Sequence, residues 1–186
     1  MRPGTVHVAL LRSDHQGSPS KRLQETSLIK SLKRRGIEPG TVAFELLESI
    51  YLDEADDIVA WNVDQIRELG IEIEIDDFGT GHTSILSLLK LQPQRLKIDR
   101  QLVRPIVDSP SQQQLLRTVV EIGHSLGIKV IAEGVETLEH ASIAATLGCD
   151  ELQGYAFSRP LSAEGFAAFA AKRQRHVAKQ LQGARK

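Results

Sequence analysis

Several features that would assign this chain to a particular class of protein are scarce in its sequence. One cysteine, Cys149, occurs in 186 residues, so the chain can form no internal disulfide and no thiolate metal cage. Any metal site must therefore use oxygen or imidazole ligands. An excess of one charge is also lacking, because 23 Lys and Arg against 24 Asp and Glu give a formal net charge of −1. We expect no nucleic-acid binding, since that balance provides no large basic field.

Long apolar runs are absent as well. No run approaches the roughly 18 residues of a membrane span, and the N-terminal Met-Arg-Pro-Gly-Thr lacks the apolar core of a signal peptide. We expect no membrane segment in this chain and a cytoplasmic location. The alternative is that the chain is a piece of a larger, membrane-attached protein. The length suits one domain with a substantial core.

What the sequence does contain is an alternation of short Val- and Ile-rich runs with longer helical patterns, which is typical of repeated strand–helix units and a parallel sheet. The candidate strands are 6–11, 42–46, 71–75, 95–98, 129–132 and 151–157. The candidate helices are 23–35, 55–69, the segments from Pro110 to Gly127 and from Thr137 to Gly148, and one from Ser162. The fold class is α/β, and the pattern fits either an open doubly wound sheet or an incomplete eight-stranded barrel.

Acidic residues stand at the ends of four successive candidate strands. Because parallel strands point the same way, these side chains should converge on one rim. Carboxylates gathered there repel one another unless a cation lies among them, and their hard oxygens suit Mg²⁺, Mn²⁺ or Ca²⁺. A single strand-end acid is more often a helix cap, but four in succession favour a metal site. The residues are Glu45, Asp76, Asp77, Asp99, Glu133 and Glu136.

Lys97 lies inside an apolar strand, two residues before Asp99. A lysine there needs a neighbouring carboxylate to offset its charge, so it is either half of a structural ion pair or a group that orients water or neutralises a phosphate. The two glycines in Asp76-Asp77-Phe78-Gly79-Thr80-Gly81 predict a turn whose backbone N–H groups can approach an anion.

Five blocks of residues resemble, in order and spacing, the EAL-domain phosphodiesterases that hydrolyse the bacterial second messenger cyclic di-GMP. The resemblance runs from about residue 21 to 170. It implies a TIM-type (β/α) barrel with its site at the carboxyl ends of the strands. The blocks are Glu45-Leu-Leu-Glu48-Ser49, Asp76-Asp77-Phe-Gly-Thr-Gly81, Leu96-Lys97-Ile-Asp99, Ala132-Glu133-Gly-Val-Glu136-Thr137, and Gln153-Gly154-Tyr155 with Arg159-Pro160-Leu161.

The resemblance also implies roles for individual residues. Glu45, Asp76, Asp77 and Glu133 would be ligands of Mg²⁺ or Mn²⁺, with Ca²⁺ inhibiting, and Lys97 would hold the attacking water. Catalysis would rest on Lys97 and Glu133, as metal-assisted hydrolysis of cyclic di-GMP to linear pGpG. Glu136 and Gln153 would lie beside the ligands or the substrate. Glu48 would anchor the loop after the aspartates, and Asp99 and Thr80 would be supporting residues.

The chain departs from the family at its N-terminal end. It has no Glu-Ala-Leu motif, and the nearest segment, Val8-Ala9-Leu10-Leu11-Arg12, has valine in place of the metal-binding glutamate. In one alignment this segment is the first strand and a segment with the second strand is missing between Gly17 and Leu23. In the other, 6–11 is the third strand and the first two are missing. Both alignments also lose an asparagine ligand.

The missing motif leaves three hypotheses for this chain: an active phosphodiesterase, an inactive EAL module that binds cyclic di-GMP or a protein partner, and a truncated remnant. Loss of ligands should weaken at least one metal, and a barrel with strands missing has open edges that invite dimerisation. We expect an N-terminal strand and loop at 1–20, an EAL-like domain at 21–170 and a basic tail at 171–186. Relatives would carry an upstream sensor or GGDEF-type domain, and a homodimer is consistent with the family.

Overall fold

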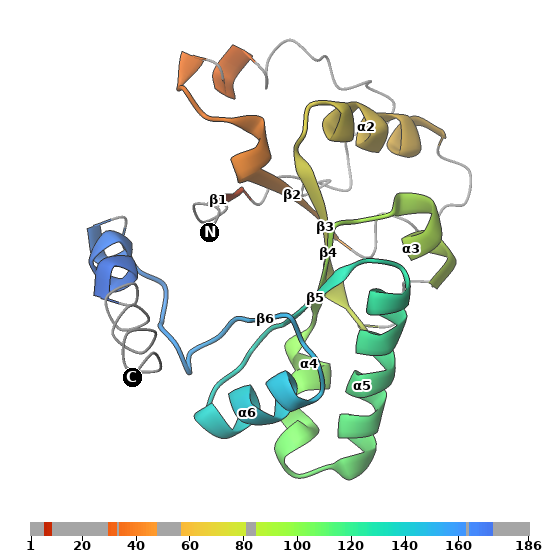
Figure 1. Ribbon diagram of the computed structural model, residues 1–186, viewed down its shortest axis with the longest axis vertical. Helices are drawn as coiled ribbons and strands as arrows, with labels where there is room; N and C mark the ends of the chain where they lie inside the picture. The colour runs from red at the N-terminus through yellow and green to blue at the C-terminus, as the bar shows by residue number, and fades with distance from the viewer. Residues whose placement is uncertain are drawn as a thin grey trace, which may run out of the picture.

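The computed structural model describes residues 6–8, 30–32, 34–47, 57–80, 85–162 and 164–172. Within these ranges six strands alternate with helices (Figure 1). The strands are β1 (Val6–Val8), β2 (Val42–Leu47), β3 (Glu72–Phe78), β4 (Arg95–Ile98), β5 (Lys129–Ala132) and β6 (Glu151–Leu152). The helical elements are η1 (Pro39–Thr41), α2 (Asp57–Glu68), α3 (Ile85–Leu91), α4 (Arg100–Val103), η3 (Arg104–Val107), α5 (Pro110–Ser125) and α6 (Leu138–Thr146), with further helical residues at 30–32, 34 and 164–172.

The order of the strands decides between the two folds that the strand–helix pattern left open, and it confirms the TIM-type barrel that the family resemblance implies. All six strands are parallel and lie in the sheet in chain order, from β1 to β6. A doubly wound sheet instead reverses its order at a switch point. Strand–helix units that always add the next strand on the same side form the wall of a barrel. The described residues therefore form six strands of a TIM-type (β/α) barrel, and among them β1 and β6 are the edge strands.

The apolar core lies between the strands and the helices that cover them. In Figure 1, α2, α3 and α5 all lie on the same side of the strands. One buried cluster packs Ile73 and Ile75 of β3 against α2 and α3, and a second packs Val130 of β5 against α5 and α6. Strands in parallel sheets are buried on both faces, and all four residues of β4 are accordingly buried.

The opposite face of the strands carries charge. Residues alternate between the two faces of a strand, so Glu72, Glu74 and Asp76 lie on the face opposite Ile73 and Ile75. Glu74 is fully buried, and its carboxylate accepts a hydrogen bond of 2.7 Å from Arg95, its register partner on β4. Burial lowers the pKa of Arg95, but Glu74, Glu72 and Glu151 outweigh that effect and raise it. Below the rim, the interior of the barrel therefore holds a layer of ion pairs between Arg95 and Glu72, Glu74 and Glu151.

The predicted strands at 42–46, 95–98 and 129–132 and the predicted helices at 55–69, 110–127 and 137–148 correspond to β2, β4, β5, α2, α5 and α6. Most of the helix predicted at 23–35 and the end of the strand predicted at 6–11 lie outside the described residues. Ser109 caps α5 by accepting a hydrogen bond from the Gln112 backbone N–H at 3.3 Å. The expected strand at 71–75 instead extends to Phe78 and contains both aspartates. The expected strand at 151–157 is wrong beyond Leu152, because the chain turns at 154–157, where the Phe157 N–H donates to the Gly154 carbonyl at 3.1 Å. None of the helices in the described ranges is long and apolar enough to cross a membrane.

Candidate metal and phosphate site

Lys97 is the centre of the charged groups at the carboxyl ends of the strands. Its Nζ donates a hydrogen bond of 3.0 Å to Glu45 Oε1 and lies 2.8 Å from both Asp76 Oδ1 and Glu133 Oε1. These carboxylates come from β2, β3 and the residue after β5, so the strand ends converge as the sequence predicted. The Lys97 side chain is only 6% exposed. A structural ion pair is therefore real, but one ammonium faces three carboxylates rather than one.

Asp77 reaches the same side as Asp76 through a break in the regular strand. Neighbouring side chains on a strand normally point to opposite faces. The pairing of β3 with β4 shifts register between Ile75 and Phe78, and Asp77 has a left-handed backbone with φ of 57°. Bulges re-aim side chains in this way, and a left-handed conformation in a residue other than glycine is a strain that clusters at functional sites.

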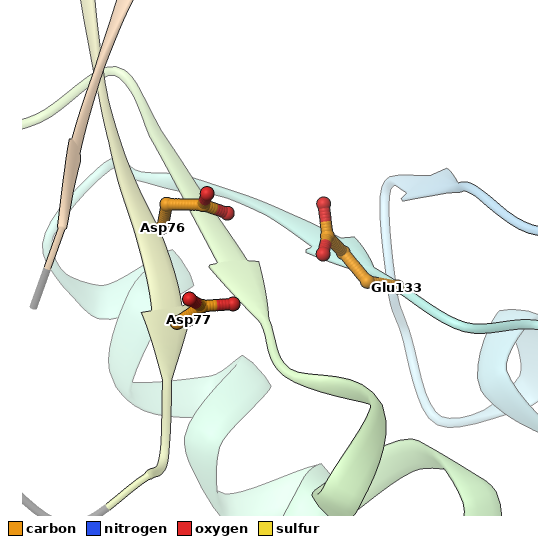
Figure 2. A group of neighbouring side chains, drawn as sticks. All are labelled: Asp76, Asp77 and Glu133. Atoms are coloured by element: carbon orange, nitrogen blue, oxygen red, sulfur yellow. The ribbon is translucent and has the colours of Figure 1, made fainter. Parts of the chain in front are cut away.

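The result is a group of three carboxylates. One oxygen from each of Asp76, Asp77 and Glu133 lies within 4.8 Å of the other two, and Figure 2 shows the three side chains pointing toward a common space. Asp76 Oδ1 and Glu133 Oε1 are buried, and each lies 2.8 Å from the Lys97 ammonium. Three grouped carboxylates outnumber the one ammonium beside them, and hard carboxylate oxygens are the ligands that divalent cations such as Mg²⁺ or Ca²⁺ prefer, so this donor set fits a hard divalent cation.

The pKa values of Glu133 and Lys97 are both shifted by the charges around them. Burial raises the pKa of Glu133, Lys97 works against that rise, and Asp76 and Asp77 add to it, with a net increase. Burial lowers the pKa of Lys97, but its contacts with Asp76 and Glu133 outweigh burial and raise it. Lys97 is therefore an ammonium throughout the neutral range.

Glu133 is held by backbone contacts on both sides. Its N–H donates to the carbonyl of Ile98 on β4 at 3.1 Å. The next residue, Gly134, has φ of +67°, and a Cβ there would lie 2.4 Å from Cβ of Arg100. Only glycine lets the chain pass α4 this closely. The glycine in the Ala132-Glu133-Gly134 block thus sets the position of the carboxylate before it.

The other predicted residues occupy different surroundings. Asp99 caps α4 by accepting a hydrogen bond of 2.7 Å from the Gln101 N–H, which is the helix-cap role weighed for a single acid. Glu136 points to Arg104, with Oε1 2.6 Å from Nη2. Thr80 and Gln153 are exposed, and the backbone of Gln153 bonds to Ala132 and Val135. Glu48 lies outside the described residues.

Two arrangements were not predicted from the sequence. The buried Glu74–Arg95 pair could have been found from the charges that alternate with isoleucines in Glu72-Ile73-Glu74-Ile75. The Arg104–Glu136 pair joins residues far apart in the chain, and the sequence carries no signal for it.

With this geometry established, comparison with known proteins identifies the family. The EAL domain model matches residues 9–160. The chain belongs to the EAL domain family. The bifunctional diguanylate cyclase/cyclic di-GMP phosphodiesterase MucR of Pseudomonas aeruginosa is 35% identical over 159 residues, which are 86% of this chain and 22% of MucR. The cyclic di-GMP phosphodiesterase PdeR of Escherichia coli is 33% identical over 141 residues, 76% of this chain and 21% of PdeR.

Solved EAL structures share the fold. The EAL domain of Mycobacterium smegmatis DcpA has a TM-score of 0.74 and 29% identity over 89% of this chain and 71% of that one. Klebsiella pneumoniae BlrP1, solved in complex with manganese and cyclic di-GMP, has a TM-score of 0.72 and 32% identity, over 84% of this chain and 39% of that one. This EAL chain spans about a fifth of the length of the curated relatives it matches.

Proposed function

We propose that this EAL domain is a metal-dependent phosphodiesterase that hydrolyses cyclic di-GMP to linear pGpG. The observation that carries the proposal is the group of Asp76, Asp77 and Glu133 beside Lys97, four charged side chains drawn together from β3, β4 and the end of β5. Relatives named as cyclic di-GMP phosphodiesterases support the choice of substrate.

Asp76, Asp77 and Glu133 would hold Mg²⁺ or Mn²⁺, with Glu45 bonded to Lys97 beside them. A bound divalent cation supplies Lewis acidity, which lowers the pKa of water and stabilises charge on the attacked phosphate. Asp77 contributes because the bulge turns its carboxylate toward the other two. The BlrP1 complexes with manganese or calcium support a divalent cation, and we propose that Ca²⁺ inhibits.

Lys97 acts as a donor and not as a base, because its pKa is raised and its ammonium stays protonated. It orients the attacking water and offsets negative charge on the phosphate. In the reaction the water oxygen forms a bond to phosphorus, the bond from phosphorus to one ribose 3′-oxygen breaks, and that oxygen receives a proton. The product is linear, with one 5′-phosphate.

A second candidate, a cyclic di-GMP receptor that does not hydrolyse its ligand, is favoured by one observation. The chain has no Glu-Ala-Leu, and Val8 stands where the family has its motif glutamate in the nearest segment. Loss of ligands or of the groups that hold them commonly costs about 10-fold to 100-fold in metal affinity or activity. The same three carboxylates would then bind metal and nucleotide without turnover.

The test is to incubate the purified chain with cyclic di-GMP and Mn²⁺ and to measure pGpG by chromatography. Glu133→Gln should abolish the product, while Glu121→Gln, an exposed change of the same kind on α5, should leave the rate unchanged. No product at micromolar enzyme overturns the phosphodiesterase proposal. Calorimetry with Ca²⁺ and cyclic di-GMP then decides the receptor: heat of binding supports it, and no binding overturns both proposals.

A further inference from the structure

The segment from Glu133 to His140, which comprises the loop after β5 and the first turn of α6, contacts α4 and η3 at three points. Gly134 packs against Arg100, the first residue of α4. The Arg104 guanidinium contacts the Glu136 carboxylate, with Nη2 and Oε1 2.6 Å apart. The Arg104 carbonyl oxygen lies 3.1 Å from His140 Nε2 on α6. The segment formed by α4 and η3, which follows β4, thus contacts the loop after β5 and also the first turn of α6.

The histidine contact has a defined direction. A carbonyl oxygen only accepts, so His140 Nε2 carries the proton and donates to Arg104 O. In the neutral ring Nδ1 is then the acceptor, and it receives the hydroxyl proton of Thr137 at 2.7 Å. The same Thr137 oxygen accepts the backbone N–H of His140 as the N-cap of α6. Hydrogen bonds between the Thr137 hydroxyl, the His140 ring and the Arg104 carbonyl therefore link the start of α6 to η3.

The α4–η3 segment is itself fixed to the strand that carries Lys97. Asp99 follows β4 directly and caps α4 with its side chain. Val103 and Ile106 of this segment are fully buried in the second core cluster. Since Lys97 and Glu133 must stay 2.8 Å apart across two strands, a rigid connection between β4 and the loop after β5 would maintain that distance.

We propose that Arg104 is a positioning residue for the candidate metal site: its guanidinium holds Glu136, the residue before the N-cap of α6, so that the loop keeps Glu133 in place. This inference rests on the proposed function, because it takes Glu133 as a ligand. The Arg104 and Glu136 side chains are 56% and 43% exposed. Exposed ion pairs contribute little to global stability, so the effect is local. Glu136, which is not among the three grouped carboxylates, is then a support and not a ligand.

The experiment uses the full chain with Mn²⁺ alone as the probe. Arg104→Ala and Glu136→Gln should each weaken Mn²⁺ binding about 5-fold to 10-fold by calorimetry, near the lower end of what loss of a ligand's support costs. The charge-reversed pair Arg104→Glu with Glu136→Arg should restore most of the affinity. Arg67→Ala is the matched control, because the Arg67 guanidinium also pairs with an acid, Asp64 at 2.8 Å, but lies on α2, which carries none of the site residues.

A second measurement needs no metal. Amide hydrogen exchange at Val135, His140 and Ala141, whose N–H groups are hydrogen-bonded within or around this loop, should become about 10-fold faster in Arg104→Ala, while amides of α2 stay unchanged. Faster exchange throughout the chain would mean a general loss of stability, and Glu136→Gln, which keeps the side-chain shape, then replaces Arg104→Ala in both measurements.

The outcomes separate the two proposals. If the wild-type chain binds no Mn²⁺, the proposed metal site fails, and exchange alone decides the role of Arg104. Weaker binding or faster local exchange that the charge-reversed pair restores supports the role. Wild-type affinity and wild-type exchange in both single variants, or losses that the reversed pair does not restore, overturn it.

Discussion

Lys97 on β4 and Glu133 at the end of β5 face each other with 2.8 Å between ammonium nitrogen and carboxylate oxygen, and the lysine faces Glu45 and Asp76 at 3.0 Å and 2.8 Å as well. In the protein without metal, one buried positive charge thus keeps three carboxylates together. Its removal should expose their mutual repulsion.

Lys97→Met should destabilise the metal-free protein. Removing one partner of a buried ion pair costs roughly 3–5 kcal/mol, and we expect the lower figure because the three carboxylates are 15–18% exposed. Urea unfolding at pH 7 measures the loss, with Lys90→Met, an exposed change on α3, as control. Saturating Mn²⁺ should recover part of the lost stability, since the cation replaces the missing charge. Equal stability of Lys97→Met and wild type would contradict the arrangement.

Gly134→Ala should weaken Mn²⁺ binding and lower stability more than Gly127→Ala. Both glycines have similar left-handed backbones, with φ of +67° and +73°, so both substitutions carry the same conformational strain. Only at Gly134 does the new methyl group collide, at 2.4 Å from Cβ of Arg100, while nothing lies within 4 Å at Gly127. Thermal unfolding and Mn²⁺ calorimetry of the two variants isolate the collision. Equal effects at both positions would refute the close contact between the loop and α4.

Binding of Mn²⁺ should be sensitive to pH through Glu133. Its pKa is raised, so protons compete with the metal at a higher pH than they would at an ordinary glutamate. Affinity should fall as the pH is lowered from 7 to 5, and binding should release protons, which calorimetry in buffers of different ionisation enthalpy detects. In Glu133→Gln the affinity should be low throughout and this part of the pH dependence should disappear. A pH-independent wild-type affinity would count against Glu133 as a ligand.

Asp150 should stabilise the fold in a pH-dependent way. Burial raises the pKa of Asp150, but the backbone N–H of Val130 and the ring of His124, 2.8 Å and 2.9 Å from its Oδ2, outweigh burial and lower it. The folded pKa is below the unfolded value of about 3.9. The stabilisation is therefore complete above the unfolded pKa and is lost as pH falls through the folded pKa.

Asp150→Asn removes that charge while keeping an acceptor for Val130. At pH 6 the variant should be less stable than wild type by roughly 1 kcal/mol, the usual net value of a hydrogen bond. The difference should shrink toward pH 3. Urea unfolding at the two pH values checks this, and a difference that is constant with pH would show that the charge of Asp150 is not responsible.

The sequence by itself determined the strands, their common direction and the rim on which the acids lie. Alternation of Val- and Ile-rich runs with helices predicted a parallel sheet, and in such a sheet Glu45, Asp76 and Glu133 must share one end. The motif blocks predicted the family, which the match over residues 9–160 confirms. The strand–helix pattern alone left open a barrel or a doubly wound sheet, because the neighbours of a strand in space cannot be read from the order of strands in the chain. The family resemblance implied the TIM-type barrel, and the strand order confirms it.

The tertiary structure alone decided which groups meet. A regular strand would place Asp76 and Asp77 on opposite faces, and only the register shift and the left-handed backbone at Asp77 bring both to Glu133. The three partners of Lys97 come from β2, β3 and the residue after β5. The Arg104–Glu136 pair joins residues that α5 and β5 separate in the chain. Local periodicity fixes the face on which a side chain lies, whereas contacts between distant segments depend on packing, which acts only once the barrel wall has formed.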